Sequence, residues 1–446
     1  MPDGETPESR PALPASVTHF GLNSIATCVA LGSLFALRLH DFGLENDMLV
    51  LMAAAAVPVI VLDVLVLRVH RRSSTGLDWQ KDFSLDPERI ATKLLGLALT
   101  LAPIAIAYWA FSEYHGTFYD PFYGLLRRFW ASLVIAAAAY TWALDGLMVD
   151  PRDAYWQLGR VALGHRSDAR GSDIANLYRG WLVKAFFLPL MLVWMHNETR
   201  NLIHFDLTTP WQNLHLYHFL YSLIFGVDLL FATVGYCLSL RLIDAHIRTA
   251  EPTMFGWVVA LFCYQPFYSL MERQYVHYDG GLSFDGWLAP WPLLRWIWAG
   301  GIIFLIAIYV LATIAFGVRF SNLTHRGILT NGPYRFTKHP AYVSKNLSWW
   351  MASIPFVPHT GWQDALRHSL LLGCVNTIYF LRARTEERHL SRDPTYVAYA
   401  LWMNDHGALR FLGRWMPFFK YKAPATTVTT AATAATAAVT ETGSTA

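Results

Sequence analysis

The residues best suited to chemistry lie in two clusters near the carboxyl end of the chain. In the first, residues 317–342, turn formers and cations separate two apolar segments, and Tyr334, His339 and Tyr342 lie close together. Pro340 suits the first turn of a helix, where its missing N–H needs no partner, so His339 is predicted at a helix N-terminus. The free N–H groups and dipole there favour a carboxylate or phosphate. The alternative is a membrane-surface loop whose cations only snorkel to the interface.

The second cluster, residues 382–390, follows the last apolar segment. On a helix, Arg382 and Glu386 lie one turn apart on the same face, and Glu387 is adjacent. Carboxylates in this place could bind ribose hydroxyls or a cationic group. The alternative is a solvated helix end whose charges pair with each other, which is the commoner meaning of such a charge run.

The elements that position these clusters are predicted to be membrane helices. Apolar residues make up 54% of the 446 residues and charged residues 15%, against about 25% charged in soluble proteins. This composition excludes disorder and most cytosolic enzymes. A membrane-spanning helix needs ~20 mostly apolar residues, so we expect an all-α, polytopic membrane helix bundle with about ten transmembrane helices. The candidates are residues 20–37, 48–68, 92–111, 130–148, 181–196, 217–240, 254–270, 296–317, 343–358 and 365–382.

The distribution of Lys and Arg predicts the orientation of the spans. Basic residues concentrate in alternate connections, as in residues 68–93, 152–179 and 319–345. By the positive-inside rule, both termini are expected in the cytoplasm. We therefore expect a multi-pass integral protein of an inner or plasma membrane. Its net charge of +3 is too small to indicate nucleic-acid binding, and its oligomeric state is left open.

Both ends of the chain, residues 1–15 and 423–446, have the composition of disordered tails. Three acids, Asp63, Asp145 and Asp228, lie within apolar segments. An acid at membrane depth is costly and often functional. For Asp145 we favour a structural pairing with a nearby Arg. For Asp63 and Asp228, a functional role and a structural role are given equal weight. Histidines and acids between residues 196 and 218 offer metal ligands, but interfacial hydrogen bonding is the favoured interpretation.

The two clusters together resemble a known family. Gly332-Pro-Tyr-Arg-Phe-Thr-Lys-His-Pro-Ala-Tyr342 is similar to the Gly-Pro-Tyr-Arg-x-x-Arg-His-Pro-x-Tyr signature of isoprenylcysteine carboxyl methyltransferases and related phospholipid methyltransferases. Arg382-x-x-x-Glu386-Glu387 resembles the closing motif of that family. The resemblance covers residues 296–415, which are expected to form a methyltransferase-like membrane domain. Residues 16–295 would then form an N-terminal transmembrane bundle of unassigned role.

The resemblance implies a methyltransferase that uses S-adenosylmethionine, without a metal, on a lipid or lipid-linked acceptor at the cytoplasmic membrane face. The cofactor would lie between the two motifs, and the lipophilic substrate would arrive from the bilayer. Arg382 and Glu386 are the expected catalytic residues. The expected cofactor-binding residues are Gly332, Tyr334, His339, Pro340, Tyr342, Glu386 and Glu387. Lys338 departs from the Arg of the signature and lacks its planar fork, which puts bidentate anion binding there in question.

The sequence also leaves two other classes of protein as alternatives. Membrane sterol reductases have a similar carboxyl-terminal arrangement and use NADPH, whose phosphate Lys338, Lys345 and Arg384 could serve. A non-enzymatic transporter is the other, motivated by Asp63 and Asp228. The Gly-Pro-Tyr-Arg sequence and the adjacent pair of glutamates favour the methyltransferase.

Overall fold

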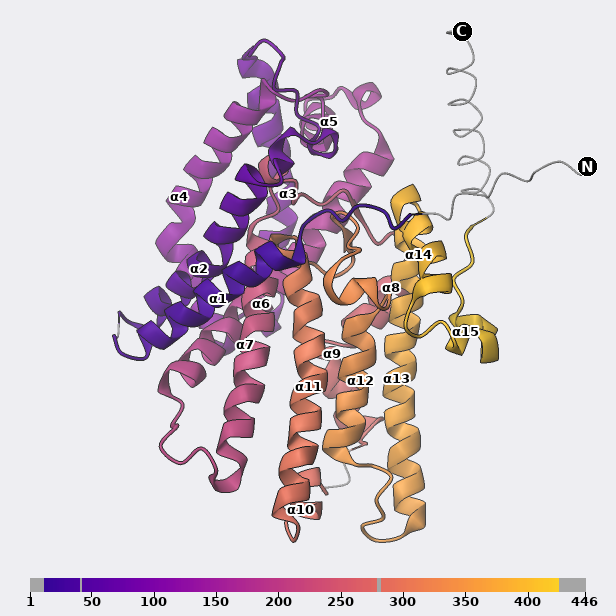
Figure 1. Cartoon of the computed structure of the whole chain (residues 1–446). Helices are drawn as coiled ribbons and strands as arrows, with labels where there is room; N and C mark the ends of the chain where they lie inside the picture. The colour runs from indigo at the N-terminus through magenta and orange to yellow at the C-terminus, as the bar shows by residue number, and fades with distance from the viewer. Residues whose placement is uncertain (1–11, 41, 279–281, 425–446) are drawn as a thin grey trace, which may run out of the picture.

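The computed structural model describes residues 12–40, 42–278 and 282–424, and it is mainly helical with almost no sheet (Figure 1). The first seven helices are α1 (Phe20–Leu37), α2 (Leu44–Leu65), α3 (Pro87–Ala110), α4 (Asp120–Asp145), α5 (Ala154–Ala162), α6 (Gly171–His204) and α7 (His215–Cys237). The others are α8 (Met254–Leu261), α9 (Phe267–Gln274), α10 (Phe284–Trp287), α11 (Pro292–Phe316), α12 (Pro340–Ser353), α13 (Trp362–Leu390), α14 (Pro394–His406) and α15 (Leu412–Trp415). A two-residue strand β1 (Thr249–Ala250) pairs antiparallel with β2 (Thr324–His325).

Seven of the described helices are long and apolar enough to cross a membrane: α1, α2, α3, α4, α6, α7 and α11. They confirm the predicted class, an all-α membrane bundle. The predicted count of about ten is not confirmed, because the segments 254–270, 343–358 and 365–382 do not meet the same criteria.

Each of the three exceptions has a physical reason. Residues 254–270 are divided between α8 and α9, of eight residues each, and Pro266, which cannot donate a backbone hydrogen bond, lies between them. Helix α12 has 14 residues, or about 21 Å at 1.5 Å per residue, short of the ~30 Å hydrocarbon core. Helix α13 is long enough, with 29 residues, but its last turns are highly charged.

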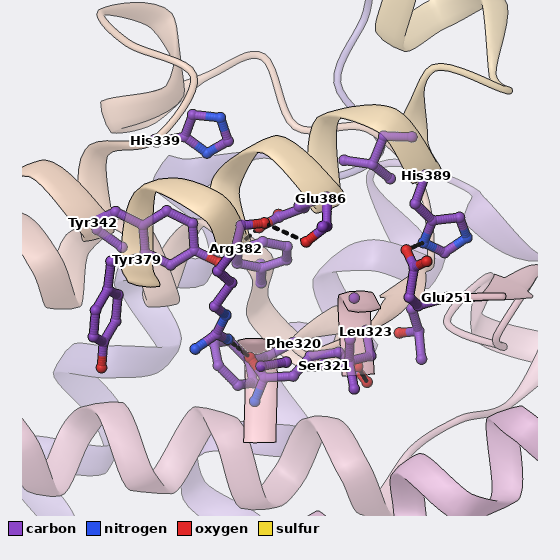
Figure 2. Close-up of a pocket in the computed structure, with 18 of the residues that line it drawn as sticks. Glu251, Phe320, Ser321, Leu323, His339, Tyr342, Tyr379, Arg382, Glu386 and His389 are labelled. Carbon is purple, nitrogen blue, oxygen red and sulfur yellow. Dashed lines mark hydrogen bonds and ion pairs between the residues drawn. The ribbon is translucent and has the colours of Figure 1, made fainter. Parts of the chain in front are cut away.

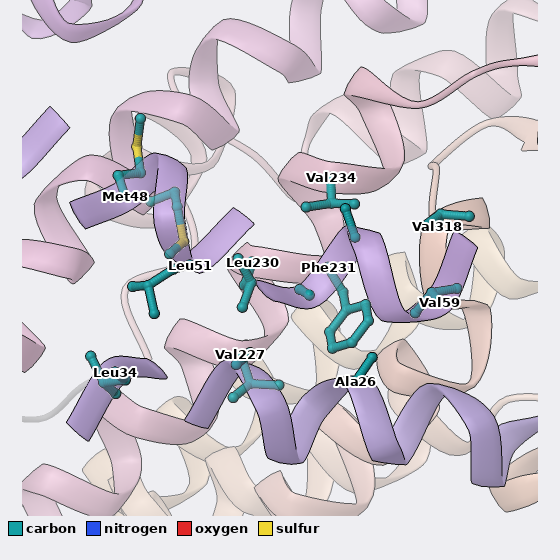
Figure 3. Packing of buried hydrophobic residues seen from close by; sticks show 14 of the residues in the cluster. Ala26, Leu34, Met48, Leu51, Val59, Val227, Leu230, Phe231, Val234 and Val318 are labelled. Carbon is teal, nitrogen blue, oxygen red and sulfur yellow. The ribbon is translucent and has the colours of Figure 1, made fainter. Parts of the chain in front are cut away.

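The largest apolar core joins α1, α2 and α7. Ala26 and Ala30 of α1 and Ala55 of α2 are buried in it, together with Phe231 and Val227 of α7 (Figure 3). In a bilayer, lipid tails are as apolar as leucine, so helices associate largely through close packing, which small residues permit. The alanines therefore account for the close contact between α1 and α2.

Helices α11, α12 and α13 stand side by side, and the loop from residue 317 to 339 connects the first two (Figure 1). The front of the chain holds this loop in place. Val17 donates its N–H to the Ile328 carbonyl at 2.9 Å, and Asn331 Nδ2 donates to the Thr18 carbonyl at 2.7 Å. The loop that carries the first motif is therefore built partly on the N-terminal segment.

The described ends of the chain lie on one side of the bundle. Leu13 packs with the cluster that contains Tyr396 and Tyr421, and Thr330 Oγ1 donates to the Pro14 carbonyl at 2.8 Å. Leu13 and Pro14, assigned to the N-terminal tail from composition, thus contact the bundle. Ala423, from the predicted C-terminal tail, packs against the same cluster, and residues 1–11 and 425–446 of the two predicted tails lie outside the described residues.

Candidate active site

The two motifs meet where α12 begins and α13 ends. His339 is the N-cap residue of α12, as Pro340 predicted, and Pro340 occupies the first turn. The His339 Nε2 and Glu387 Oε1 atoms lie 3.1 Å apart, and the Tyr342 hydroxyl donates to Glu386 Oε2 at 2.7 Å. Residues more than forty positions apart in the sequence are thus brought into direct contact.

A buried hollow, here called the inner pocket, lies on the Glu386 side of α13. Figure 2 shows Tyr342, Arg382 and Glu386 around its centre, with Glu251 and His389 at the other end. Its volume is about 110 Å³. Two carboxylates, Glu251 and Glu386, and five tyrosines line it, together with basic groups that include Lys338, Lys345 and Arg382.

A wider hollow, here called the outer cleft, adjoins the inner pocket and is separated from it by a wall of shared side chains. Its volume is about 990 Å³, and it is formed by α12, α13, α14 and the segment from residue 407 to 420. Glu386 lines only the inner pocket, whereas Glu387 lines only the outer cleft. The residues that line both, and so form the wall between them, are Lys338, His339, Tyr342 and Tyr379.

Glu387 is buried among three basic groups. Its carboxylate lies 2.5 Å from Lys338 Nζ, 2.7 Å from Arg384 Nη1 and 3.1 Å from His339 Nε2. Burial alone would raise the pKa of Glu387, but the hydrogen bond from His339 and the charge of Lys338 outweigh it and lower the pKa to about 2. Glu387 therefore stays ionised at physiological pH. Lys338, the departure from the family signature, makes an internal ion pair.

Arg382 is buried beside the inner pocket. Its Nη2 donates to Asn322 Oδ1 at 2.6 Å, and its guanidinium lies over the rings of Tyr264 and Tyr342, 5.4 and 5.3 Å from their centroids. Among the described residues it forms no ion pair with Glu386. The guanidinium is thus oriented by an amide and two aromatic faces, which suits Arg better than Lys.

Two expected cofactor-binding residues, Gly332 and Pro340, line neither hollow. Gly332 has φ +57°, and a Cβ there would lie 2.8 Å from the Phe20 ring, so this position requires glycine. Both residues shape the chain around the site. Tyr334 does line the inner pocket, and its carbonyl accepts a hydrogen bond from Tyr399 at 2.6 Å.

Glu251 and His389, at one end of the inner pocket, were not predicted as site residues. The His389 Nδ1 and Glu251 Oε2 atoms lie 3.7 Å apart, and His389 Nε2 lies 2.9 Å from Thr249 Oγ1. Burial and the positive charges of His325, Arg392 and Arg179 lower the pKa of His389 to about 4. Glu251 follows β1, so pairing of β1 with β2 carries it to the site. No local sequence pattern signals that long-range pairing.

The three acids within apolar segments all have partners. Asp63 Oδ2 lies 2.5 Å from Arg319 Nη1, and Asp145 makes the expected pairing, with Arg89 and Lys93. Asp228 accepts hydrogen bonds from Tyr309 and Thr313, both at 2.5 Å. Each carboxylate thus has an internal partner, so a structural role accounts for all three without transport.

Within the described ranges, no three His, Cys, Asp or Glu residues are grouped so as to hold a metal ion. Comparisons with protein-family models, curated proteins and solved structures find no match for this chain. Inference about its function therefore starts from the chemistry of the two hollows and the wall between them.

Proposed function

We propose that this protein is an integral-membrane methyltransferase that uses S-adenosylmethionine and acts on a lipid or lipid-linked acceptor at the cytoplasmic membrane face. One observation carries the proposal: the two consecutive carboxylates of α13 line different hollows. Glu386 lines the inner pocket, and Glu387 lines the outer cleft. A thin wall of side chains between two binding spaces suits group transfer from a donor on one side to an acceptor on the other. The resemblance of both motifs to membrane methyltransferases supports the same class.

The inner pocket has the chemistry that the sulfonium of S-adenosylmethionine requires. A sulfonium is a cation, and carboxylates and the faces of aromatic rings both attract cations. Glu386 and Glu251 supply the carboxylates, and Tyr264, Tyr334 and Tyr342 supply the rings. When bound, the cofactor would provide an electrophilic methyl group. Such a transfer needs alignment and exclusion of water more than a strong acid or base.

The remaining site residues would position these groups. The Tyr342 hydroxyl holds Glu386, and ionised Glu387 holds Lys338 and His339 in the wall. Arg382, oriented by Asn322, would bind an anionic part of the cofactor or acceptor. The lipophilic substrate would enter from the outer cleft, whose walls include Leu347 and Phe380.

Isothermal calorimetry on the full-length protein in detergent tests the proposal, with S-adenosylmethionine and NADPH titrated in parallel. We expect binding of S-adenosylmethionine that Glu386→Gln abolishes and that Glu113→Gln, at an exposed acid, leaves unchanged. Binding of NADPH alone would establish the reductase class instead. Binding of neither ligand would reject the assignment of the inner pocket.

The contacts of the basic residues weigh against the reductase. Of the three cations that could serve the phosphate of NADPH, Lys338 and Arg384 are paired with Glu387. Lys345 lies over the rings of Tyr309 and Trp349. A phosphate at Lys338 or Arg384 would have to compete with Glu387, whereas Glu386, held by the Tyr342 hydroxyl, has no ion-pair partner among the described residues.

A further inference from the structure

The outer cleft combines apolar walls with a basic rim. The side chains of Leu347, Trp350 and Phe380, from α12 and α13, form part of its apolar walls. Its lining carries five cations, Lys338, Arg384, Arg410, Arg414 and Lys420, and two acids, Glu387 and Asp405, besides the imidazole of His339. A space of this kind suits an amphiphile with a negative headgroup.

The basic groups of the rim differ in whether they form an ion pair with an acid. Lys338 and Arg384 are paired with Glu387, and Arg410 Nη1 donates only to a backbone carbonyl, that of Asp405, at 2.9 Å. Arg414 and Lys420 are exposed and have no ion-pair partner in the described part of the chain. Within the described ranges, the three positive charges at this end of the cleft therefore form no ion pair with a carboxylate.

Exposed apolar side chains lie in the wall of the cleft and elsewhere on the helices that form it. Leu347, in its wall, is 49% exposed, and Leu366 and Leu370 are exposed farther along α13. Beside the rim, Trp415 is 83% exposed, and tryptophan is enriched where membrane meets water. Phe418 contacts Phe380 edge-on, with ring centroids 5.9 Å apart, and so ties the basic segment to α13.

We propose that the outer cleft binds one anionic phospholipid, with its phosphate against Arg410, Arg414 and Lys420 and an acyl chain along α12 and α13. Cations near a lipid surface favour anionic over zwitterionic headgroups, and the apolar wall favours an acyl chain over a soluble phosphate. The role of this lipid as methyl acceptor rests on the proposed function. Binding of the lipid to the cleft does not require methyltransferase activity.

Native mass spectrometry of the full-length protein in detergent tests the proposal. Phosphatidylglycerol and phosphatidylcholine with identical acyl chains are compared without S-adenosylmethionine. We expect phosphatidylglycerol to bind roughly tenfold more tightly at low salt, a preference that Arg410→Gln/Arg414→Gln/Lys420→Gln removes and that added salt weakens. The matched control is Arg166→Gln, at an exposed position outside the cleft, which should keep the preference.

Several outcomes would overturn the proposal. These are equal binding of the two lipids, a triple variant that keeps the preference, or equal loss in Arg166→Gln. Displacement by glycerol 3-phosphate at the concentration of the lipid would indicate a soluble phosphate ligand. Displacement by S-adenosylmethionine would make the cleft the cofactor site. If S-adenosylmethionine does not bind at all but the preference for phosphatidylglycerol remains, only the proposed function fails.

Discussion

One hydroxyl holds the carboxylate on which the proposed cofactor site depends. Tyr342→Phe removes the hydrogen bond to Glu386 but keeps the ring under Arg382. Hydrogen bonds to charged groups contribute about 1.5–3 kcal/mol, so we expect the affinity for S-adenosylmethionine to fall roughly tenfold or more, as measured by calorimetry. Tyr275→Phe, at a highly exposed tyrosine, is the control. An unchanged affinity in Tyr342→Phe would show that this hydrogen bond does not contribute to binding of the cofactor.

His389 predicts a dependence of stability on pH. Its pKa is about 4 in the folded protein, against about 6.5 in an unfolded chain. Between these values the unfolded state binds the extra proton, so stability is full above pH 6.5 and falls as the pH drops toward 4, by up to about 3 kcal/mol. Thermal unfolding in detergent should show this slope, and His389→Gln should reduce it. An identical slope in the variant would contradict the assignment.

Sequence reasoning located some residues of the site but not its contacts. Pro340 made His339 predictable as an N-cap residue, and the helical spacing placed Arg382 and Glu386 on one face. Neither pattern predicts how far His339 lies from Glu387, because that distance depends on how α12 and α13 pack. Glu251 was missed for the same reason, since it reaches the pocket through a two-residue strand pairing.

At the scale of elements, α7 approaches the loop of the first motif closely at Gly235. A Cβ there would lie 2.4 Å from the Phe320 carbonyl oxygen, so Gly235→Ala must displace backbone, and such overpacking costs about 1–3 kcal/mol. The control is Gly300→Ala in α11, where nothing lies within 4 Å and alanine is neutral or stabilising by about 0.5–1 kcal/mol.

Thermal unfolding of the two glycine variants in detergent measures the difference. We expect a lower midpoint for Gly235→Ala, together with weaker binding of S-adenosylmethionine, because the loop also supplies Asn322, the partner of Arg382. Equal midpoints for the two variants would mean that the loop moves freely away from α7.

Helices were predictable where a single apolar segment defined them. The spans that became α1, α2 and α11 needed only length and hydropathy. The segment 254–270 has a similar composition but is interrupted between α8 and α9, whereas α2 continues through its own Pro58. Helix α13 combines an apolar helix with a charged end that serves the site. Average hydropathy cannot separate these two uses of one helix, so the predicted count of about ten spans is not confirmed.

For the whole molecule, the front of the chain is a structural support for the motif loop. Arg326 is buried and donates hydrogen bonds to carbonyls of α7 and of the loops around it: those of Gly235, Leu238, Ala245, Val318 and Phe320. Arg319 likewise connects the loop to Asp63 of α2 and to the Asp244 carbonyl. Residues 16–295 therefore contribute to the site by holding the loop between α11 and α12.

The ion pair between Asp63 and Arg319 tests this role against transport. Both side chains are about 1% exposed, so Asp63→Asn leaves a buried guanidinium uncompensated and should cost about 3–5 kcal/mol. In a double-mutant cycle with Arg319→Met, measured by thermal unfolding in detergent, the double variant should be destabilised by at least about 1 kcal/mol less than the sum of the single variants. If Asp63→Asn instead leaves stability unchanged and abolishes proton- or sodium-driven uptake in proteoliposomes, the acid serves transport and the pair is not a structural support.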